Sequence, residues 1–264
     1  MIIGPCAVGT VSVLRDRIAI VPPLEPMVWD GPLPGHLAVI LDGNGRWAQR
    51  RGLSRVEGHR AGAKAVRELV RSCRRLGVPA LTLYAFSAQN WQRPTGEVMA
   101  LMRLLHHYTR RERSEILDNG IRFNCVGDLM SLPSAVRDAL EELMAASADN
   151  DEMVLSLAVS YGGREELIGA ARNLAARAVA GEIDPTQIDE TLLNETLWTR
   201  GLPPDVDLVI RTGGECRVSN FLLWQIAYAE LWFTDIFWPD FGHEHLEEAL
   251  RDFGDRTRRF GQVA

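Results

Sequence analysis

The feature that most constrains the fold is the apolar run at residues 37–41 (LAVIL), in which apolar and polar residues do not alternate. A strand with one solvated face would alternate, so this run predicts a strand buried on both faces, as in a parallel sheet. Further short apolar runs follow, separated by longer stretches with helical spacing. We therefore predict a single α/β domain with a mainly parallel sheet of about six strands, flanked by helices.

The predicted elements alternate along the chain. The strands are expected at residues 37–41, 80–86, 121–126, 154–159, 206–210 and 231–233. The helices are expected at residues 59–76, 95–119, 133–146, 164–180, 191–198 and 243–260. Residues 36–264 are predicted to form the domain.

The first 35 residues differ in character from the rest. They contain prolines without any periodic apolar pattern, namely Pro22, Pro23, Pro26, Pro32 and Pro34. We predict a poorly ordered leader over residues 1–35. No stretch of the chain approaches the roughly 18 consecutive apolar residues that a membrane span needs.

Charge and cysteine content exclude some classes of function. The net charge of −6 and the pI near 5.6 argue against a general nucleic-acid binder. Four cysteines, Cys6, Cys73, Cys125 and Cys216, are scattered without zinc-binding spacing. This pattern indicates a reducing compartment, the cytoplasm, and no structural metal.

The first predicted strand ends on a candidate binding motif, Asp42-Gly43-Asn44-Gly45-Arg46-Trp47. Ligands of open α/β sheets gather at the carboxyl ends of strands, which would place Asp42 at a binding crevice. The glycines permit close approach of the backbone, and the arginine suits phosphate. A metal-bound or phosphorylated substrate is one interpretation; a simple turn is the other.

A second polar segment follows the strand at residues 80–86. Ser87, Asn90 and Arg93 are hydrogen-bond donors on a loop that Pro94 could hinge. Such a loop could close over a diphosphate and exclude water. Alternatively, it is an ordinary connection to the next helix, with Glu97 in the first turn of that helix.

A third segment repeats the pattern after the strand at residues 206–210. Arg211, Arg217 and Ser219 follow that strand around two glycines. Two guanidinium groups and a hydroxyl are what a diphosphate anchor requires. We therefore favour an anion site here over a solvated loop.

Two further positions suggest ligand binding. Arg55 and His59 lie at the expected start of a helix, where phosphate groups bind and where both would add positive charge. Glu230 lies in a very apolar stretch, so its carboxylate must be paired or bound to a cation. It could share Mg²⁺ with Asp42 and a substrate phosphate, or pair with a buried arginine.

Taken together, these segments resemble the cis-prenyltransferases, the undecaprenyl diphosphate synthase family. The resemblance covers roughly residues 34–262 and includes Gly58-His59, Tyr161-Gly-Gly-Arg164 and Arg258-Arg-Phe-Gly261. It implies condensation of isopentenyl diphosphate with an allylic diphosphate, farnesyl or geranyl, to a (Z)-polyprenyl diphosphate such as undecaprenyl diphosphate. Mg²⁺ is the implied cofactor.

The resemblance also implies roles for individual residues. Asp42 and Asn90 would be catalytic, and Asp42 and Glu230 would bind the metal. The allylic diphosphate would be held by Gly43, Asn44, Gly45, Arg46, Arg55 and His59, with Trp47 beside them. Isopentenyl diphosphate would be held by Arg211, Arg217 and Ser219. The catalytic loop would contain Ser87, Trp91 and Arg93, with Glu97 positioning it.

In this family the helix predicted at 95–119 lines a hydrophobic product tunnel. His106 or His107 would make that tunnel more polar or shorter if either faced inward, whereas both would be harmless on the outer face. Ala85 is small and would leave room for a growing chain. Departures from the family pattern occur at Gln89, Ser160 and Cys216, and none removes a residue named above.

The resemblance leaves other functions open. One is a short-chain or branched terpenoid diphosphate synthase, and another is a non-catalytic scaffold subunit, which should have lost the Asp42 motif. The apolar stretch 221–238 predicts a homodimer. Because the product is a lipid, loose association with a membrane is expected of an otherwise cytoplasmic enzyme.

Overall fold

The computed structural model describes residues 24–258, and it contains one six-stranded sheet. All pairings between its strands are parallel, in the order β3-β4-β2-β1-β5-β6. The strands are β1 (His36–Ile40), β2 (Ala80–Ser87), β3 (Ile121–Val126), β4 (Met153–Tyr161), β5 (Leu208–Arg211) and β6 (Glu230–Phe233). The predicted fold class is therefore confirmed, and each strand lies close to its predicted position.

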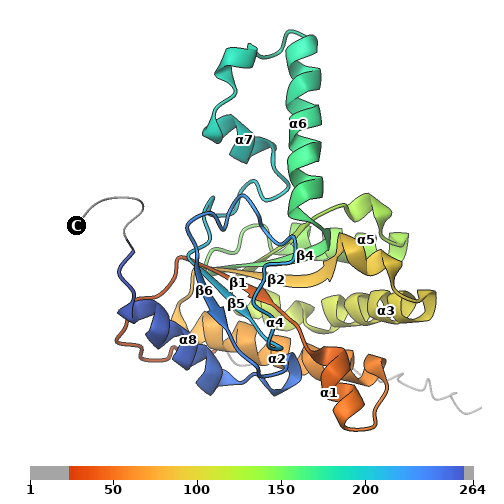
Figure 1. Cartoon of the computed structure of the whole chain (residues 1–264), viewed down its shortest axis with the longest axis vertical. Helices are drawn as coiled ribbons and strands as arrows, with labels where there is room; N and C mark the ends of the chain where they lie inside the picture. The colour runs from red at the N-terminus through yellow and green to blue at the C-terminus, as the bar shows by residue number, and fades with distance from the viewer. Residues whose placement is uncertain (1–23, 259–264) are drawn as a thin grey trace, which may run out of the picture.

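Helices connect these strands and cover the sheet (Figure 1). They are α1 (Asn44–Arg50), α2 (Arg55–Leu76), α3 (Thr95–Arg111), α4 (Arg113–Asp118), α5 (Ser134–Ala146), α6 (Gly163–Val179), α7 (Glu190–Thr196) and α8 (His243–Asp255). Short 3₁₀ turns occur at η1 (Ala88–Gln92), η2 (Leu129–Ser131), η3 (Pro185–Gln187) and η4 (Trp238–Asp240).

Three helical predictions need correction. The first predicted helix begins at Arg55, not at residue 59, because Ser54 and Glu57 form a capping box that fixes its start. The single helix predicted at 95–119 is two helices, α3 and α4, which meet at Glu112. The short helix α1, which begins directly after the Asp42-Gly43 turn, was not predicted.

The two faces of the sheet are covered differently. On one face, buried residues of α2, α3, α5 and α8 pack against the strands and form the larger apolar core. On the other face, Phe221, Leu222 and Val206 come from irregular segments and form a smaller core with Ala38 and Ile40 of β1. Helix α6 projects from the body of the molecule, with α7 beside it (Figure 1).

The described part of the predicted leader, residues 24–35, lies against the domain. Met27, Trp29 and Leu33 pack on the larger core. The backbone N–H of Met27 donates to Arg75 O at 2.7 Å. Residues 1–23 lie outside the described range. Within residues 24–258, none of the helices combines the length and apolar character needed to span a membrane.

Candidate active site

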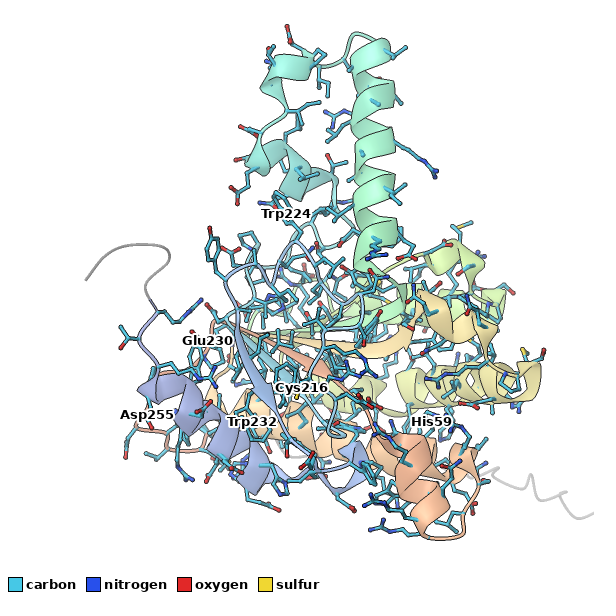
Figure 2. The ribbon with its side chains drawn as sticks, viewed as in Figure 1. His59, Cys216, Trp224, Glu230, Trp232 and Asp255 are labelled. Carbon is cyan, nitrogen blue, oxygen red and sulfur yellow. The ribbon has the colours of Figure 1, made fainter. Side chains whose placement is uncertain are left out.

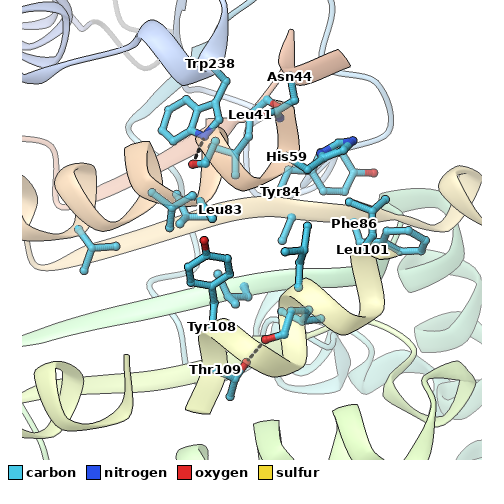
Figure 3. A pocket seen from close by; sticks show the side chains of 18 of the residues that line it. Leu41, Asn44, His59, Leu83, Tyr84, Phe86, Leu101, Tyr108, Thr109 and Trp238 are labelled. Carbon is cyan, nitrogen blue, oxygen red and sulfur yellow. Dashed lines mark hydrogen bonds between the residues drawn. The ribbon is translucent and has the colours of Figure 1, made fainter. Parts of the chain in front are cut away.

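A cavity of about 410 Å³ opens at the carboxyl edge of the sheet and runs along one sheet face beneath α2 and α3. Polar residues lie at its mouth: Asp42, Asn44, His59, Ser87, Asn90, Arg93, Arg211 and Ser219. Apolar side chains line its interior, among them Leu41, Leu83, Phe86, Leu101 and Trp238, as Figure 3 shows. Ile121, Phe123 and Leu155, from the amino halves of β3 and β4, mark its far end. Such a cavity suits a ligand with a charged head and a long apolar tail.

Asp42 lies at the centre of the mouth, just beyond the end of β1. Its carboxylate accepts a hydrogen bond from Gly43 N at 2.6 Å and pairs with Arg46 at 3.1 Å and Arg211 at 3.0 Å. Burial alone would raise the pKa of this carboxyl group, but the hydrogen bond from Arg211 and the charge of Arg46 together lower it. Asp42 is therefore an anion at neutral pH, and its side chain is 31% exposed.

The backbone at Gly43 requires glycine. Gly43 has φ 107° and forms the N-cap of α1, and a Cβ atom there would lie 2.7 Å from Phe237. The turn directs α1 away from Asp42 and leaves the side chain of Asn44 at the cavity, with Asn44 Nδ2 bound to Leu41 O at 3.0 Å. This is why a glycine follows the aspartate.

The absence of a side chain at Gly45 leaves space for the guanidinium group of Arg55. A Cβ atom at Gly45 would lie 2.7 Å from Arg55 Nη1. The guanidinium of Arg55 therefore passes over the backbone of α1 on its way to Glu97, to which Arg55 Nε donates at 3.1 Å. The predicted proximity of the Asp42 motif and Arg55 is thus realised by packing between α1 and α2.

Glu97 is the centre of the positively charged side of the mouth. It accepts from Arg55 Nε and from Arg93 Nη1, each at 3.1 Å, and its side chain is only 12% exposed. Burial raises the pKa of Glu97, but Arg55 and Arg93 outweigh burial and lower it. Glu97 thus holds both arginines at the mouth.

His59 is neutral, contrary to the prediction that it adds charge. Burial, followed by the positive charge of Arg93, lowers the pKa of His59 to about 4. Its Nε2 atom lies 3.7 Å from Glu97 Oε1 and has no hydrogen-bond partner within the described residues. A buried ring nitrogen without a partner at the cavity mouth is available to a bound ligand.

Arg211 is buried behind Asp42, at the end of β5. Arg211 Nη2 donates to Asp42 Oδ2 at 3.0 Å, and Nη1 donates to Ser219 Oγ at 2.8 Å and to Arg217 O. The guanidinium of Arg217 instead pairs with Glu215 at 2.6 Å, and its side chain is 62% exposed. The structure therefore brings Arg211 and Ser219 to the cavity and leaves the Arg217 side chain at the surface.

The predicted catalytic loop is the 3₁₀ turn η1. Asn90 Oδ1 accepts from Ser87 N at 3.1 Å, which fixes both residues at the mouth. Trp91 points elsewhere: its ring packs edge-on against Phe86, and its Nε1 donates to Ser160 Oγ at 3.0 Å. Trp91 therefore supports the loop from inside the fold and does not line the cavity.

Trp47 also lies away from the cavity. Its Nε1 donates to Asp240 Oδ1 at 2.7 Å, and the guanidinium of Arg51 stacks on its ring at 4.2 Å. The structure does not bring the Trp47 ring to the mouth that Asp42 and Arg211 form. Its contacts hold α1 against η4.

The prediction that Glu230 shares an ion with Asp42 is wrong within a single chain. Glu230 begins β6 and is level with Leu208 of β5, which is level with Leu37 of β1. Asp42 follows the other end of β1. At about 3.3 Å per residue, the two carboxylates are roughly 16 Å apart along the strands.

Glu230 has another partner. Its Oε2 accepts from Arg256 Nη1 at 2.8 Å, so Glu230 pairs with an arginine, as the alternative interpretation held, but this arginine is partly exposed and not buried. Figure 2 shows Glu230 on the opposite side of the molecule from His59. Within residues 24–258, no group of three or more His, Cys, Asp or Glu side chains is placed to hold a metal ion.

The two histidines of α3 do not reach the cavity. Leu101, Leu105 and Tyr108 of α3 line it instead, while His107 is exposed at the surface. Figure 3 shows the Tyr108 ring turned toward Leu83. The α3 residues that line the interior are therefore apolar apart from the Tyr108 hydroxyl and Thr109. Sequence reasoning missed Tyr108, although it lies seven positions after Leu101, on the same face of α3.

Comparison with known proteins identifies the family of the chain. Residues 40–261 match the family described as "Putative undecaprenyl diphosphate synthase". The chain belongs to the undecaprenyl diphosphate synthase family. It is a cis-prenyltransferase, as the sequence resemblance implied, and its enzymatic class is that of a transferase acting in cis-prenyl chain elongation.

Several relatives support this assignment. An isoprenyl transferase of Clostridium perfringens is 46% identical over 90% of this chain and 94% of its own length. A ditrans,polycis-undecaprenyl-diphosphate synthase of Xanthomonas axonopodis pv. citri, specific for (2E,6E)-farnesyl diphosphate, is 48% identical over 91% and 93%. The crystal structure of lavandulyl diphosphate synthase from Lavandula x intermedia, in complex with dimethylallyl diphosphate, has a TM-score of 0.85 and 38% identity, covering 87% of this chain and 98% of that one.

Proposed function

We propose that this cis-prenyltransferase condenses isopentenyl diphosphate with farnesyl or geranyl diphosphate, with Mg²⁺, to a (Z)-polyprenyl diphosphate such as undecaprenyl diphosphate. The observation that carries the proposal is the contact between two anion sites. Asp42 of the first site and Arg211 of the second lie 3.0 Å apart at the mouth of one apolar cavity. Two diphosphates bound there would lie side by side, with C1 of the allylic tail close to the alkene of isopentenyl diphosphate.

The allylic diphosphate would bind beside α1. Arg46, Arg55 and Arg93 supply positive charge on this side, and the free His59 Nε2 supplies a neutral donor. Gly43 and Gly45 let the phosphates approach the backbone. The apolar tail would then enter the cavity past Leu41 and Phe86.

Isopentenyl diphosphate would bind beside Arg211. Arg211 already donates to Ser219 and to the backbone of Arg217, which holds its guanidinium plane fixed. A rigid forked donor favours a diphosphate over a single point charge. The exposed Arg217 side chain would turn from Glu215 toward the same ligand.

The residues fit a Mg²⁺ ion that is held largely by substrate. Asp42 offers one ionised carboxylate, partly exposed at 31%, and Mg²⁺ commonly binds to one or two carboxylates together with phosphate oxygens. When bound, the ion would stabilise the negative charge that develops on the departing diphosphate.

The protein's own residues would hold the two substrates in place and stabilise the charge that develops. Arg46 and Arg211 would stabilise the same developing charge, and the Asn90 amide would orient the loop over the reacting carbons. The proton that leaves the new chain needs an acceptor. Asn90 cannot act as a base at neutral pH, so we assign this step to a diphosphate oxygen of the substrate.

The enzyme is proposed to act as a cytoplasmic homodimer that associates loosely with membranes through its product and binds no nucleic acid. The cysteines in the described range, Cys73, Cys125 and Cys216, are free thiols, which supports a reducing compartment. Strand β6 lies at an edge of the sheet, with Tyr228 and Leu231 exposed at 65% and 36%. An exposed edge with apolar side chains supports pairing of two copies there.

A short-chain or branched terpenoid diphosphate synthase is a second candidate. The likeness to lavandulyl diphosphate synthase favours it. The length of the cavity, from Asp42 to Ile121, favours a longer product. A non-catalytic scaffold is disfavoured because the charged groups of the mouth are all present.

One experiment separates these candidates. Purified protein is incubated with labelled isopentenyl diphosphate, Mg²⁺ and allylic starters from dimethylallyl to geranylgeranyl diphosphate, and the products are sized. We expect long (Z)-polyprenyl products from farnesyl diphosphate. A single condensation with every starter would support the short-chain alternative, and no product at all would support the scaffold and refute our proposal.

A further inference from the structure

A row of arginines on α2 bridges to the α3–α4 segment beside the far part of the cavity. We call this row the arginine ladder: Arg67, Arg71 and Arg74 of α2, with their acceptors Glu112, Glu115 and Asn119. The arginines follow one another by one turn of α2, as the acceptors do on the facing segment. The ladder therefore joins the two helical segments along the seam between them.

Two members of the ladder are forked ion pairs. Arg67 donates to both oxygens of Glu112, through Nε at 2.7 Å and through Nη2. Arg71 donates to both oxygens of Glu115, at 2.5 Å and 2.9 Å. The side chains of Glu112 and Glu115 are only 20% and 16% exposed, so these pairs are better shielded from solvent than surface ion pairs.

The third member ties the ladder to the end of the sheet. Arg74 Nε donates to Asn119 O at 2.9 Å, and Arg74 Nη2 donates to Glu152 Oε2 at 2.8 Å. Asn119 and Glu152 immediately precede β3 and β4, at the edge of the sheet opposite to Asp42. The ladder thus extends to the end of the cavity that is far from the chemistry.

The wall of the cavity changes character at the ladder. Nearer the mouth, α2 and α3 contribute apolar lining residues such as Val66, Leu101 and Leu105. Farther in, Arg67, Glu112 and Glu115 line the cavity themselves. In this far part, a growing hydrocarbon chain therefore meets charged, hydrogen-bonded wall on the side of α2 and α4, beside apolar residues such as Ile121 and Phe123 on the sheet.

We propose that the ion pairs Arg67–Glu112 and Arg71–Glu115 close the side of the cavity at its far end and set the chain length at which elongation stops. This inference rests on the proposed elongation function and deepens it. A tail that reaches the ladder can continue outward only by separating a forked pair, which leaves two charges against hydrocarbon without partners. A tail that stays inside the cavity can grow only until it fills the cavity volume.

The break between α3 and α4 makes this closure local. Glu112 lies at the junction, where α3 ends and α4 begins, and the Glu112 side chain is held by Arg67. The short helix α4 carries Glu115 and is held to α2 through Arg71. Loss of one pair would free a short segment and leave the mouth, formed by Asp42 and the residues around it, in place.

The test compares product lengths. The variant Arg71→Met removes the forked pair with Glu115, together with a contact to Glu68 on the same helix, and replaces a residue that does not line the cavity. With farnesyl diphosphate and labelled isopentenyl diphosphate, we expect its product distribution to shift longer by at least one isoprene unit. The rate of the first condensation should stay within about twofold of the wild type, because a short starter does not extend to the ladder.

Two further variants sharpen the result. The exchanged pair Arg71→Glu with Glu115→Arg restores opposite charges across the seam and should return the length toward the wild-type value. The control Glu247→Gln removes a comparable carboxylate, the partner of the exposed Arg251 on α8, which does not line the cavity, and should not alter product length. Melting temperatures establish that each variant is folded. If Arg71→Met does not fold, Glu115→Asp takes its place. This substitution keeps the negative charge but shortens the side chain, so that the carboxylate no longer reaches Arg71.

Each outcome decides one question. An unchanged distribution in a folded Arg71→Met or Glu115→Asp variant would overturn the inference while leaving the elongation function intact. Equal lengthening by the Glu247→Gln control would also overturn it, since the effect would not be specific to the ladder. Absence of product from the wild type would instead refute the proposed function.

Discussion

Asp42 and Arg211 form a direct ion pair across the ends of two neighbouring strands, with Asp42 Oδ2 lying 3.0 Å from Arg211 Nη2. The residues are far apart in the sequence, but β1 and β5 are adjacent in the sheet. The pair joins the two proposed diphosphate sites. Under the proposed function, both substrates would bind next to this pair.

Replacing Asp42 should abolish most activity without unfolding the protein. Asp42→Asn removes the anion that would hold the metal ion, so we expect the condensation rate to fall at least about a hundredfold. Incorporation of labelled isopentenyl diphosphate measures this. Asp240→Asn is the matched control, because Asp240 also pairs with an arginine, Arg51, but outside the cavity. A near-normal rate for Asp42→Asn would show that the metal assignment is wrong.

Replacing Arg211 with lysine should weaken binding of isopentenyl diphosphate. A lysine keeps the charge but cannot reproduce the three contacts that the buried guanidinium makes with Asp42, Ser219 and the backbone of residue 217. We expect the KM for isopentenyl diphosphate to rise about tenfold or more, with a smaller effect on the KM for the starter. Steady-state kinetics with each substrate varied in turn tests this, and Arg51→Lys serves as control. An equal rise in both KM values would argue against separate sites.

His59 should make the protein sensitive to acid. The pKa of His59 is about 4 in the folded protein, whereas its ordinary value is 6.5. As the pH falls, the unfolded state therefore takes up a proton before the folded state does. Stability should therefore be lost progressively as pH falls from about 6.5 to about 4, by up to about 3 kcal/mol from this residue.

Urea unfolding across this pH range compares the wild type with His59→Gln, which should lose less stability on acidification. His107→Gln, at an exposed position, should behave like the wild type. His36 is also buried with a lowered pKa, so only the difference between variants isolates His59. The same slope in wild type and His59→Gln would contradict the assignment of a neutral, buried imidazole.

Gly58 should tolerate no side chain. A Cβ atom there would lie 2.1 Å from the backbone oxygen of Asn44, so α1 and α2 would have to separate. We expect Gly58→Ala to destabilise the fold by about 1–3 kcal/mol and to disturb the mouth. Gly169→Ala is the matched control: it lies within a helix in open space and should stabilise by up to about 1 kcal/mol. Equal melting temperatures for the two variants would refute close packing of α1 on α2.

Much of the architecture could be predicted from periodicity. The strand at 121–126 was predicted at its observed bounds, and the unalternating run near residue 37 correctly indicated a parallel sheet. The site motifs were found because glycine and arginine follow strand ends, where parallel sheets bind ligands. Strand order, however, is not written in local sequence, so the contact of Asp42 with Arg211 could not be foreseen.

The remaining errors have local physical causes. Residues 109–115 are all polar but include neither glycine nor proline, so no helix breaker marks the break at Glu112. Helix α1 has few apolar residues and begins on glycine, so no periodic signal marks it. The partner of Glu230, Arg256, lies 26 positions later, so local sequence could not decide between a metal ion and an arginine as its partner.

The apolar lining of the cavity affects the rate at which the product leaves. A finished polyprenyl tail that slides out into water exposes hydrocarbon at about 0.8 kcal/mol per CH₂ group, so each added unit makes departure slower. We therefore expect turnover of long products to be governed by departure of the lipid, and detergent or bilayer in the assay to accelerate it.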